Sequence, residues 1–267
     1  MKILPLVGVV LAFSGLVRSA SAHDTWLIAD RFNVAPKATV TLDLTSGMDF
    51  PKLDAAIKPE RVQTAKCRLG KQTIELAEKL AGSHSLQFKT ELANPAIATI
   101  WVSLAPRALE LKPDEVKHYL EEVDAPAALR LEWSEMKEQR WRESYTKHTK
   151  TFVRVGEPRD DRSWAEPVGA PLEIVPEKDP TTFRVGEAFP VRVFKNGAPF
   201  ADFSVNAVAA GQTKGETRKT DPAGRVAFRL ATAGRWMLRA TDIRRSTAPD
   251  VDWESDFTTM TIEVADK

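Results

Sequence analysis

Short segments in which polar and apolar residues alternate recur along most of this sequence. Residues 39–44 and 84–90 show the alternation, and residues 97–102 are apolar at every position except Thr99. Alternation is typical of a strand with one buried face, and a continuous apolar run is typical of a strand buried on both faces. Further strand patterns lie at residues 151–155, 172–175, 191–194, 205–208, 225–230, 236–240 and 260–264. Glycine-containing turns separate them, and strands at this spacing predict an antiparallel β-sandwich.

The middle of the chain carries a different pattern. Pro113 is followed by two acidic residues, which is typical of a helix start, and apolar residues then recur at helical spacing through Val123. A second start near Pro126 predicts a longer, highly charged helix that reaches Tyr145. We therefore expect two tandem β-sandwich domains, at residues 23–110 and 150–267, separated by a helical insert at 111–149.

A weak internal repeat accompanies this division. Residues 32–34 and 40–42 are matched by residues 183–185 and 191–193, with the same spacing between the two elements of each pair. Coincidence of strand patterning and a true duplication of one sandwich both explain the match.

The first 22 residues have the layout of a cleaved secretory signal. Lys2 precedes an apolar run to Leu16, and the segment ends in Ala20-Ser21-Ala22. The run is too short for a stable membrane span, and no second one follows, so we expect an exported, periplasmic protein without a transmembrane segment. After cleavage 36 basic and 37 acidic residues would remain, a balance that does not suggest a nucleic-acid partner.

The single cysteine, Cys67, cannot form an intramolecular disulfide, and we expect it to be a buried, inert thiol. The seven tryptophans are expected to pack in cores and interfaces, although sugar stacking is the alternative. None of the common nucleotide-binding, hydrolase or zinc-protease motifs is present. The sequence therefore predicts a protein that is not an enzyme.

Cleavage after Ala22 would make His23 the first residue of the mature chain. Its α-amine and imidazole Nδ1 could then chelate one metal ion, and such nitrogen donors suit Cu²⁺ and Ni²⁺. His84, on a predicted strand of the same domain, would supply a second imidazole, and Asp24 an oxygen. His148 is expected at the surface, from where it could approach across the domain interface, whereas His118 is expected to face solvent.

Several stretches of the chain resemble a family of exported bacterial proteins of unknown function. They are Ala22-His23-Asp24-Thr25-Trp26-Leu27 and residues 82–86, 142–145, 150–156, 169–176, 220–226 and 255–261. Members are often labelled as a periplasmic component of cobalt/nickel transport. The resemblance implies immunoglobulin-like sandwiches, the second similar to carboxypeptidase regulatory-like modules. It also implies binding of Ni²⁺ or Co²⁺, as in nickel-transport small subunits, although there the histidine follows a methionine.

These observations lead to three functional hypotheses. The first is capture of a divalent metal (Ni²⁺, Co²⁺ or Cu²⁺) and its delivery to a membrane uptake system. The second is an interaction module without metal, which binds a glycan or a protein partner. The third is a copper-dependent oxidative enzyme, for which an N-terminal histidine with a second histidine would be the copper site.

Overall fold

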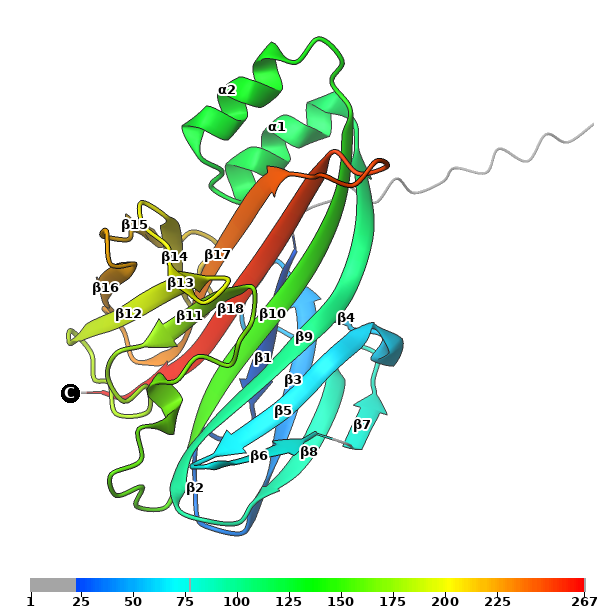
Figure 1. Cartoon of the computed structure of the whole chain (residues 1–267). Helices are drawn as coiled ribbons and strands as arrows, with labels where there is room; N and C mark the ends of the chain where they lie inside the picture. Colours follow the sequence, from blue (N-terminus) through cyan, green and yellow to red (C-terminus); the bar gives the residue numbers. More distant parts are fainter. Residues whose placement is uncertain (1–22, 77, 267) are drawn as a thin grey trace, which may run out of the picture.

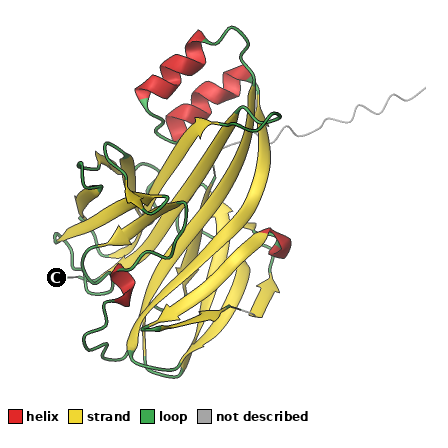
Figure 2. Cartoon of the chain, in the orientation of Figure 1, coloured by secondary structure: helices red, strands yellow, loops and turns green. Residues whose placement is uncertain are grey.

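A computed structural model describes residues 23–76 and 78–266 of the protein (Figure 1). The predicted signal peptide, residues 1–22, lies outside the described residues. Strands dominate the described chain, and its two α-helices form a hairpin at one end (Figure 2). No described helix is both long enough and apolar enough to cross a membrane. The prediction of a mainly β fold is confirmed.

The largest sheet runs through the whole molecule and includes the longest strands. Its spatial order is β15 (Glu216–Lys219), β14 (Ser204–Ala209), β17 (Gly234–Arg245), β18 (Trp253–Val264), β10 (Trp141–Val155), β9 (Ala96–Leu111), β5 (Val62–Leu69) and β6 (Gln72–Glu75), with β2 (Asn33–Val34) at the end of β10. We call it the shared sheet, because two smaller sheets pack against it. Most neighbours are antiparallel, but β10 and β18 pair in parallel. The chain that connects them forms most of the second sandwich.

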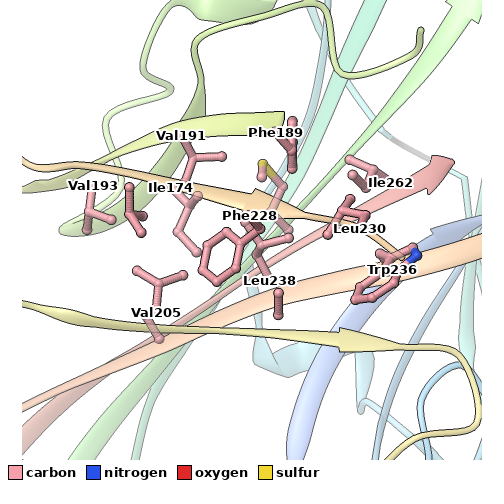
Figure 3. Close-up of a cluster of buried hydrophobic side chains, with 14 of the residues drawn as sticks. Ile174, Phe189, Val191, Val193, Val205, Phe228, Leu230, Trp236, Leu238 and Ile262 are labelled. Carbon is pink, nitrogen blue, oxygen red and sulfur yellow. The ribbon is translucent and has the colours of Figure 1, made fainter. Parts of the chain in front are cut away.

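One smaller sheet contains β1 (Asp24–Ala29), β3 (Ala38–Gly47), β8 (Leu86–Leu92) and β7 (Glu78–Ala81), with β4 (Ala55–Ala56) beside β3. The other contains β11 (Leu172–Pro176), β12 (Ala188–Lys195) and β13 (Ala198–Pro199), with β16 (Arg225–Arg229) beside β12. Each encloses an apolar core against the shared sheet; Figure 3 shows the core around Phe189 and Phe228. The expected pair of sandwiches is thus present, joined through one sheet.

The internal repeat corresponds to equivalent positions in the two sandwiches. Phe32 O accepts a hydrogen bond from Arg154 N at the end of β10, and Phe183 O accepts one from Ala265 N just beyond β18. The following strands, β3 and β12, each bury a valine completely, Val40 and Val191 respectively. Both copies therefore begin with a short parallel contact to a central strand of the shared sheet.

The helical hairpin is shorter than the sequence pattern predicts. Helix α1 (Pro113–Glu122) begins at the expected proline, and its apolar stripe is buried. Helix α2 (Ala127–Glu135) ends ten residues before Tyr145, which lies in β10. The predicted continuation of the helix to Tyr145 is wrong, because the chain pairs with β9 from Trp141 onward and with β18 from Glu143 onward. Those pairings involve distant segments and override the local pattern.

Strand β1 lies at the edge of its sheet, yet buried threonines of the shared sheet satisfy its outward backbone groups. Thr149 Oγ1 accepts a hydrogen bond from Leu27 N at 2.8 Å, and Thr261 Oγ1 donates to Leu27 O at 2.6 Å. Thr259 Oγ1 donates to Thr25 O in the same way. An edge strand that would otherwise be open to pairing is thereby fixed across the face of a second sheet.

Replacing Thr261 with valine tests this contact. The side chain keeps its shape but leaves Leu27 O buried without its donor, so we expect the free energy of unfolding to fall by about 1–3 kcal/mol. Denaturant unfolding measures the change, with Thr232→Val, at an exposed threonine, as the matched control. Equal stability of the two variants would contradict this account of β1.

Candidate functional site

His23 and Asp24 lie at the start of β1, where basic residues surround them. His23 is half-buried, and its carbonyl oxygen accepts a hydrogen bond from Lys147 Nζ. The Asp24 carboxylate forms an ion pair with Arg239. Burial raises the pKa of Asp24, although Arg239 opposes the shift. The Asp24 carboxylate, which was the predicted oxygen ligand, is therefore already bound to the guanidinium group of Arg239. A metal ion bound by His23 and Asp24 would lie next to two cations, Arg239 and Lys147.

His84 lies elsewhere and is exposed. It lies in the turn before β8, and its ring Nδ1 is 3.1 Å from Asp54 O. The prediction that His84 lies on a strand is wrong, because β8 begins only at Leu86. In the spatial order of the sheet, β3 separates β8 from β1.

His148 is buried, contrary to the expected surface position. It neighbours Lys147 in sequence, so strand alternation places it on the opposite face of the shared sheet. Its Nδ1 is 2.9 Å from Ser103 Oγ, and its Nε2 is 3.6 Å from Asp256. Burial of Asp256 is outweighed by hydrogen bonds from His148, Thr146 and Arg244, which lower its pKa to about 2.

The structure thus brings His23 and Asp24 together and places His84 apart from them. His148 lines the same small cavity as Asp24, but its imidazole is next to Ser103 and Asp256. His118 is exposed on α1, as expected. In residues 23–76 and 78–266, no three histidine, cysteine, aspartate or glutamate side chains are grouped so that they could hold a metal ion. Cys67 is buried, and burial raises the pKa of its thiol to about 12, as expected of an inert thiol.

The residues around His23 form a cluster of cations and aromatic rings. Lys147 Nζ lies 5.6 Å from the ring centroid of Tyr145 and 5.2 Å from that of Phe257. Arg61 Cζ is 5.7 Å from the same Tyr145 ring, and Arg107 is paired with Tyr145 across β9 and β10. Next to Lys147, a small cavity of about 10 Å³ has room for one water molecule.

Lys147 is the most perturbed of these cations. Its pKa is lowered from 10.5 to about 8, mainly by burial. The charges of Arg61 and Arg107 contribute to this decrease, and those of Asp24 and Glu143 oppose it. An ammonium group held in this way binds its proton less tightly in the folded chain than in the unfolded one.

The lowered pKa of Lys147 should make the stability of the protein depend on pH. Between pH 8 and 10.5 the unfolded chain binds more protons at this residue than the folded chain, so the free energy of unfolding should rise with pH across that window. Lys147→Met should remove this rise, which amounts to on the order of 3 kcal/mol. Denaturant unfolding at several pH values measures it, with Lys89→Met, at an exposed lysine, as the control. An unchanged slope in Lys147→Met would refute the assignment.

A second buried polar centre fixes the helical hairpin to the shared sheet. The Glu143 carboxylate accepts hydrogen bonds from Tyr119 of α1 at 2.8 Å, from Trp141 Nε1 of β10 at 2.6 Å and from Ser255 of β18. Glu143 is 1% exposed, and burial raises its pKa. Trp141 and Trp253 stack beside it at 4.6 Å between ring centroids. The hairpin is therefore held through specific contacts as well as apolar packing.

Between the two helices lies a groove of about 340 Å³. We call it the hairpin groove; its lining is Pro113, Lys117, Leu120, Glu121, Arg130, Trp133, Ser134 and Gln139. Leu120 and Trp133 are its buried apolar members, while Lys117 and Arg130 are exposed cations on opposite helices. Leu131 on α2 is 57% exposed.

Comparison of the sequence with protein-family models gives one match, to a family described as a domain of unknown function, DUF4198, over residues 20–243. The chain belongs to the DUF4198 family. The matched range includes β1, the basic residues around His23 and the whole hairpin of this DUF4198 protein, and it ends within β17. The description of the family contains no metal or transport function. A comparison with curated proteins gives no match.

Solved structures similar to this DUF4198 protein are distant in sequence. The D0-D1 domain of intimin is 14% identical, with 90% of this chain and 97% of that chain covered and a TM-score of 0.22. The Yersinia pseudotuberculosis adhesin InvE is 12% identical (89% and 58% covered, TM-score 0.24), and the ectodomain of mouse nectin-like molecule 4 is 9% identical (91% and 64% covered, TM-score 0.23). Likenesses of this size carry no argument about function.

Sequence reasoning missed both Lys147 and the hairpin groove of this DUF4198 domain. Lys147 lies in a run of charged residues that resembles an exposed helix, and its partners, His23 and Phe257, are more than 100 residues away. The sequence gives only a weak indication of the groove. Leu120 and Trp133 are each an expected apolar residue of a predicted helix, but the packing of one helix on the other cannot be inferred from either pattern alone.

Proposed function

We propose that this protein is an interaction module that is not an enzyme, and that its hairpin groove binds an apolar segment of a protein partner. The observation that carries the proposal is the groove itself, a concave and largely apolar site of about 340 Å³. Its size lies within the range of pockets that hold ligands. The module would act in the periplasm after export.

The way the hairpin is attached supports a binding role. Tyr119 of α1 is hydrogen-bonded to Glu143 of the shared sheet, and the hairpin lies at one end of the molecule (Figure 1). Leu131 on α2 is exposed. A hairpin anchored through Glu143 presents a preformed site, and preformed sites lose less conformational entropy on binding. An amphipathic segment laid in an apolar groove is a recurrent mode of peptide recognition.

The rim of the groove suggests the chemistry of the partner segment. Lys117 comes from α1 and Arg130 from α2, and Arg130 is 3.6 Å from Asp124. Lys117 forms no ion pair with the described residues, so its ammonium group is open to a new partner. We therefore assign the groove to a segment with an apolar anchor residue and a nearby carboxylate.

Site-specific photo-crosslinking in the cells that produce the protein tests this proposal. A photoreactive residue in place of Gln139, which lines the groove, should capture one discrete protein, whereas the same residue in place of Lys89, far from the hairpin, should not. Adding Ser134→Trp, which fills the groove, should abolish capture, and Ser83→Trp in an exposed loop should leave it intact. Capture that survives Ser134→Trp would contradict the proposal.

The same experiment distinguishes binding in the hairpin groove from the metal-capture hypothesis. Capture should be unchanged when the cells are treated with EDTA, because no step of this binding involves His23. Dependence on nickel, cobalt or copper would instead favour the metal-capture hypothesis.

A further inference from the structure

The cluster of cations and aromatic rings around His23, which includes Tyr145, contains more cations than carboxylates. Arg61, Arg107, Lys147 and Arg239 lie around Asp24 and Glu143, and the charge of a further acid, Glu122, acts on Asp24. Asp24 is bound by Arg239, and the oxygens of Glu143 accept from Tyr119, Trp141 and Ser255. Neither acid is therefore hydrogen-bonded to Arg61, Arg107 or Lys147.

These three cations also have unused hydrogen-bond donors. Arg61 Nη2 donates to Ala105 O at 2.9 Å, but its Nε is buried and has no partner in the part of the chain that the structure describes. Lys147 Nζ carries three protons, and its one hydrogen-bond acceptor among the described residues is His23 O. Arg107 is exposed, and no described residue accepts a hydrogen bond from its guanidinium group.

Like charges held together in this way are unfavourable unless an anion joins them. Backbone pairing sets the arrangement: Tyr145 is opposite Arg107 across β9 and β10, and Lys147 follows two residues later on the same face of β10. Arg61 precedes β5, the next strand of the sheet. The cations of Arg61 and Lys147 therefore lie over one aromatic ring, Tyr145, and Arg107 is the backbone neighbour of that residue on the adjacent strand and acts on the charge of Lys147.

We propose that Arg61, Arg107 and Lys147 form a binding site for a single anionic group, a phosphate or a carboxylate of a small ligand. The guanidinium groups supply paired donors that suit such oxygens, and the ammonium group supplies a point charge. Tyr145 and Phe257 form an apolar wall on which the rest of the ligand rests. This site is separate from the hairpin groove and does not depend on it.

Calorimetric titration of the mature chain (residues 23–267) with inorganic phosphate and with acetate tests the site. Saturable binding of at least one anion is expected, and the preference between the two identifies the ligand class. Arg107→Gln should weaken binding about tenfold or more, since it removes a charge-assisted contact at an exposed position where folding is not at risk. Arg159→Gln, the same change in a distant exposed loop, should bind like the wild type.

Two results would overturn the proposal. One is the absence of saturable heat with both anions. The other is equal weakening by Arg107→Gln and Arg159→Gln, which would show that only overall charge matters. Retained phosphate binding in Ser134→Trp, with loss of partner capture, would show that the two sites act independently.

Discussion

Replacing Glu173 with alanine should destabilise the protein by about 3–5 kcal/mol, because a buried charge would lose its partner. Glu173 and Lys150 are 2% and 6% exposed, and they form an ion pair between β11 and the shared sheet. Glu173 also accepts hydrogen bonds from Val168 N at 2.7 Å and Gly169 N at 3.1 Å. Burial lowers the pKa of Lys150, and the charge of Glu173 and its hydrogen bond oppose that shift.

Denaturant unfolding measures this effect, and two further variants define its cause. Lys219→Ala, which breaks an exposed pair with Asp202, should change stability by less than about 1 kcal/mol. The double variant Lys150→Met, Glu173→Leu should regain part of the loss, because an apolar pair of similar size replaces the ion pair. The backbone N–H groups of Val168 and Gly169 would still lack their acceptor. A loss in Glu173→Ala no larger than in Lys219→Ala would show that the pair does not hold the second sandwich in place.

Replacing Glu143 with alanine should release the helical hairpin from the shared sheet. Three buried donors, on Tyr119, Trp141 and Ser255, would lose their acceptor, at a cost of about 1–3 kcal/mol each. Hydrogen exchange should increase at residues 113–135, while the two sandwich cores keep their protection. Glu143→Gln retains one acceptor oxygen and should show a smaller effect.

The contribution of Glu143 to the free energy of unfolding should also depend on pH. Because burial raises the pKa of Glu143 above 4.5, the folded chain holds this proton more tightly than the unfolded chain. The contribution of Glu143 to stability is therefore present at low pH and is lost as pH rises through its folded pKa. Glu143→Gln should remove that dependence. Exchange that increases equally in hairpin and cores would contradict the anchoring role.

Much of the fold could be predicted from local patterns. Alternation at residues 39–44 and the helix start at Pro113 each correspond to an element with the expected burial. These signals work because one face of each element is buried against the core. Residues 141–149 lack such a face: their side chains Glu143, Lys147 and His148 are polar, yet they contact buried partners. Two of those partners, Ser255 and the carbonyl of His23, lie 112 and 124 residues away.

The candidate sites were harder to predict for the same reason. His23 and Asp24 stood out because of their position after the predicted cleavage site, and the structure does place them in a polar cluster. The cations that dominate the cluster come from the turn before β5 and from β9, β10 and β17, and only the sheet order brings them together. Residue type predicted a metal site, whereas the neighbours contributed by the fold favour an anion.

The affinity of the crosslinked partner for the purified mature chain tests the central claim most directly. The partner, purified separately, should bind the wild type and Ser83→Trp with the same dissociation constant, in the presence of EDTA. Ser134→Trp should weaken binding at least about tenfold, since a filled groove excludes the anchor residue of the partner. Equal affinity for Ser134→Trp and the wild type would show that the hairpin groove is not the binding site.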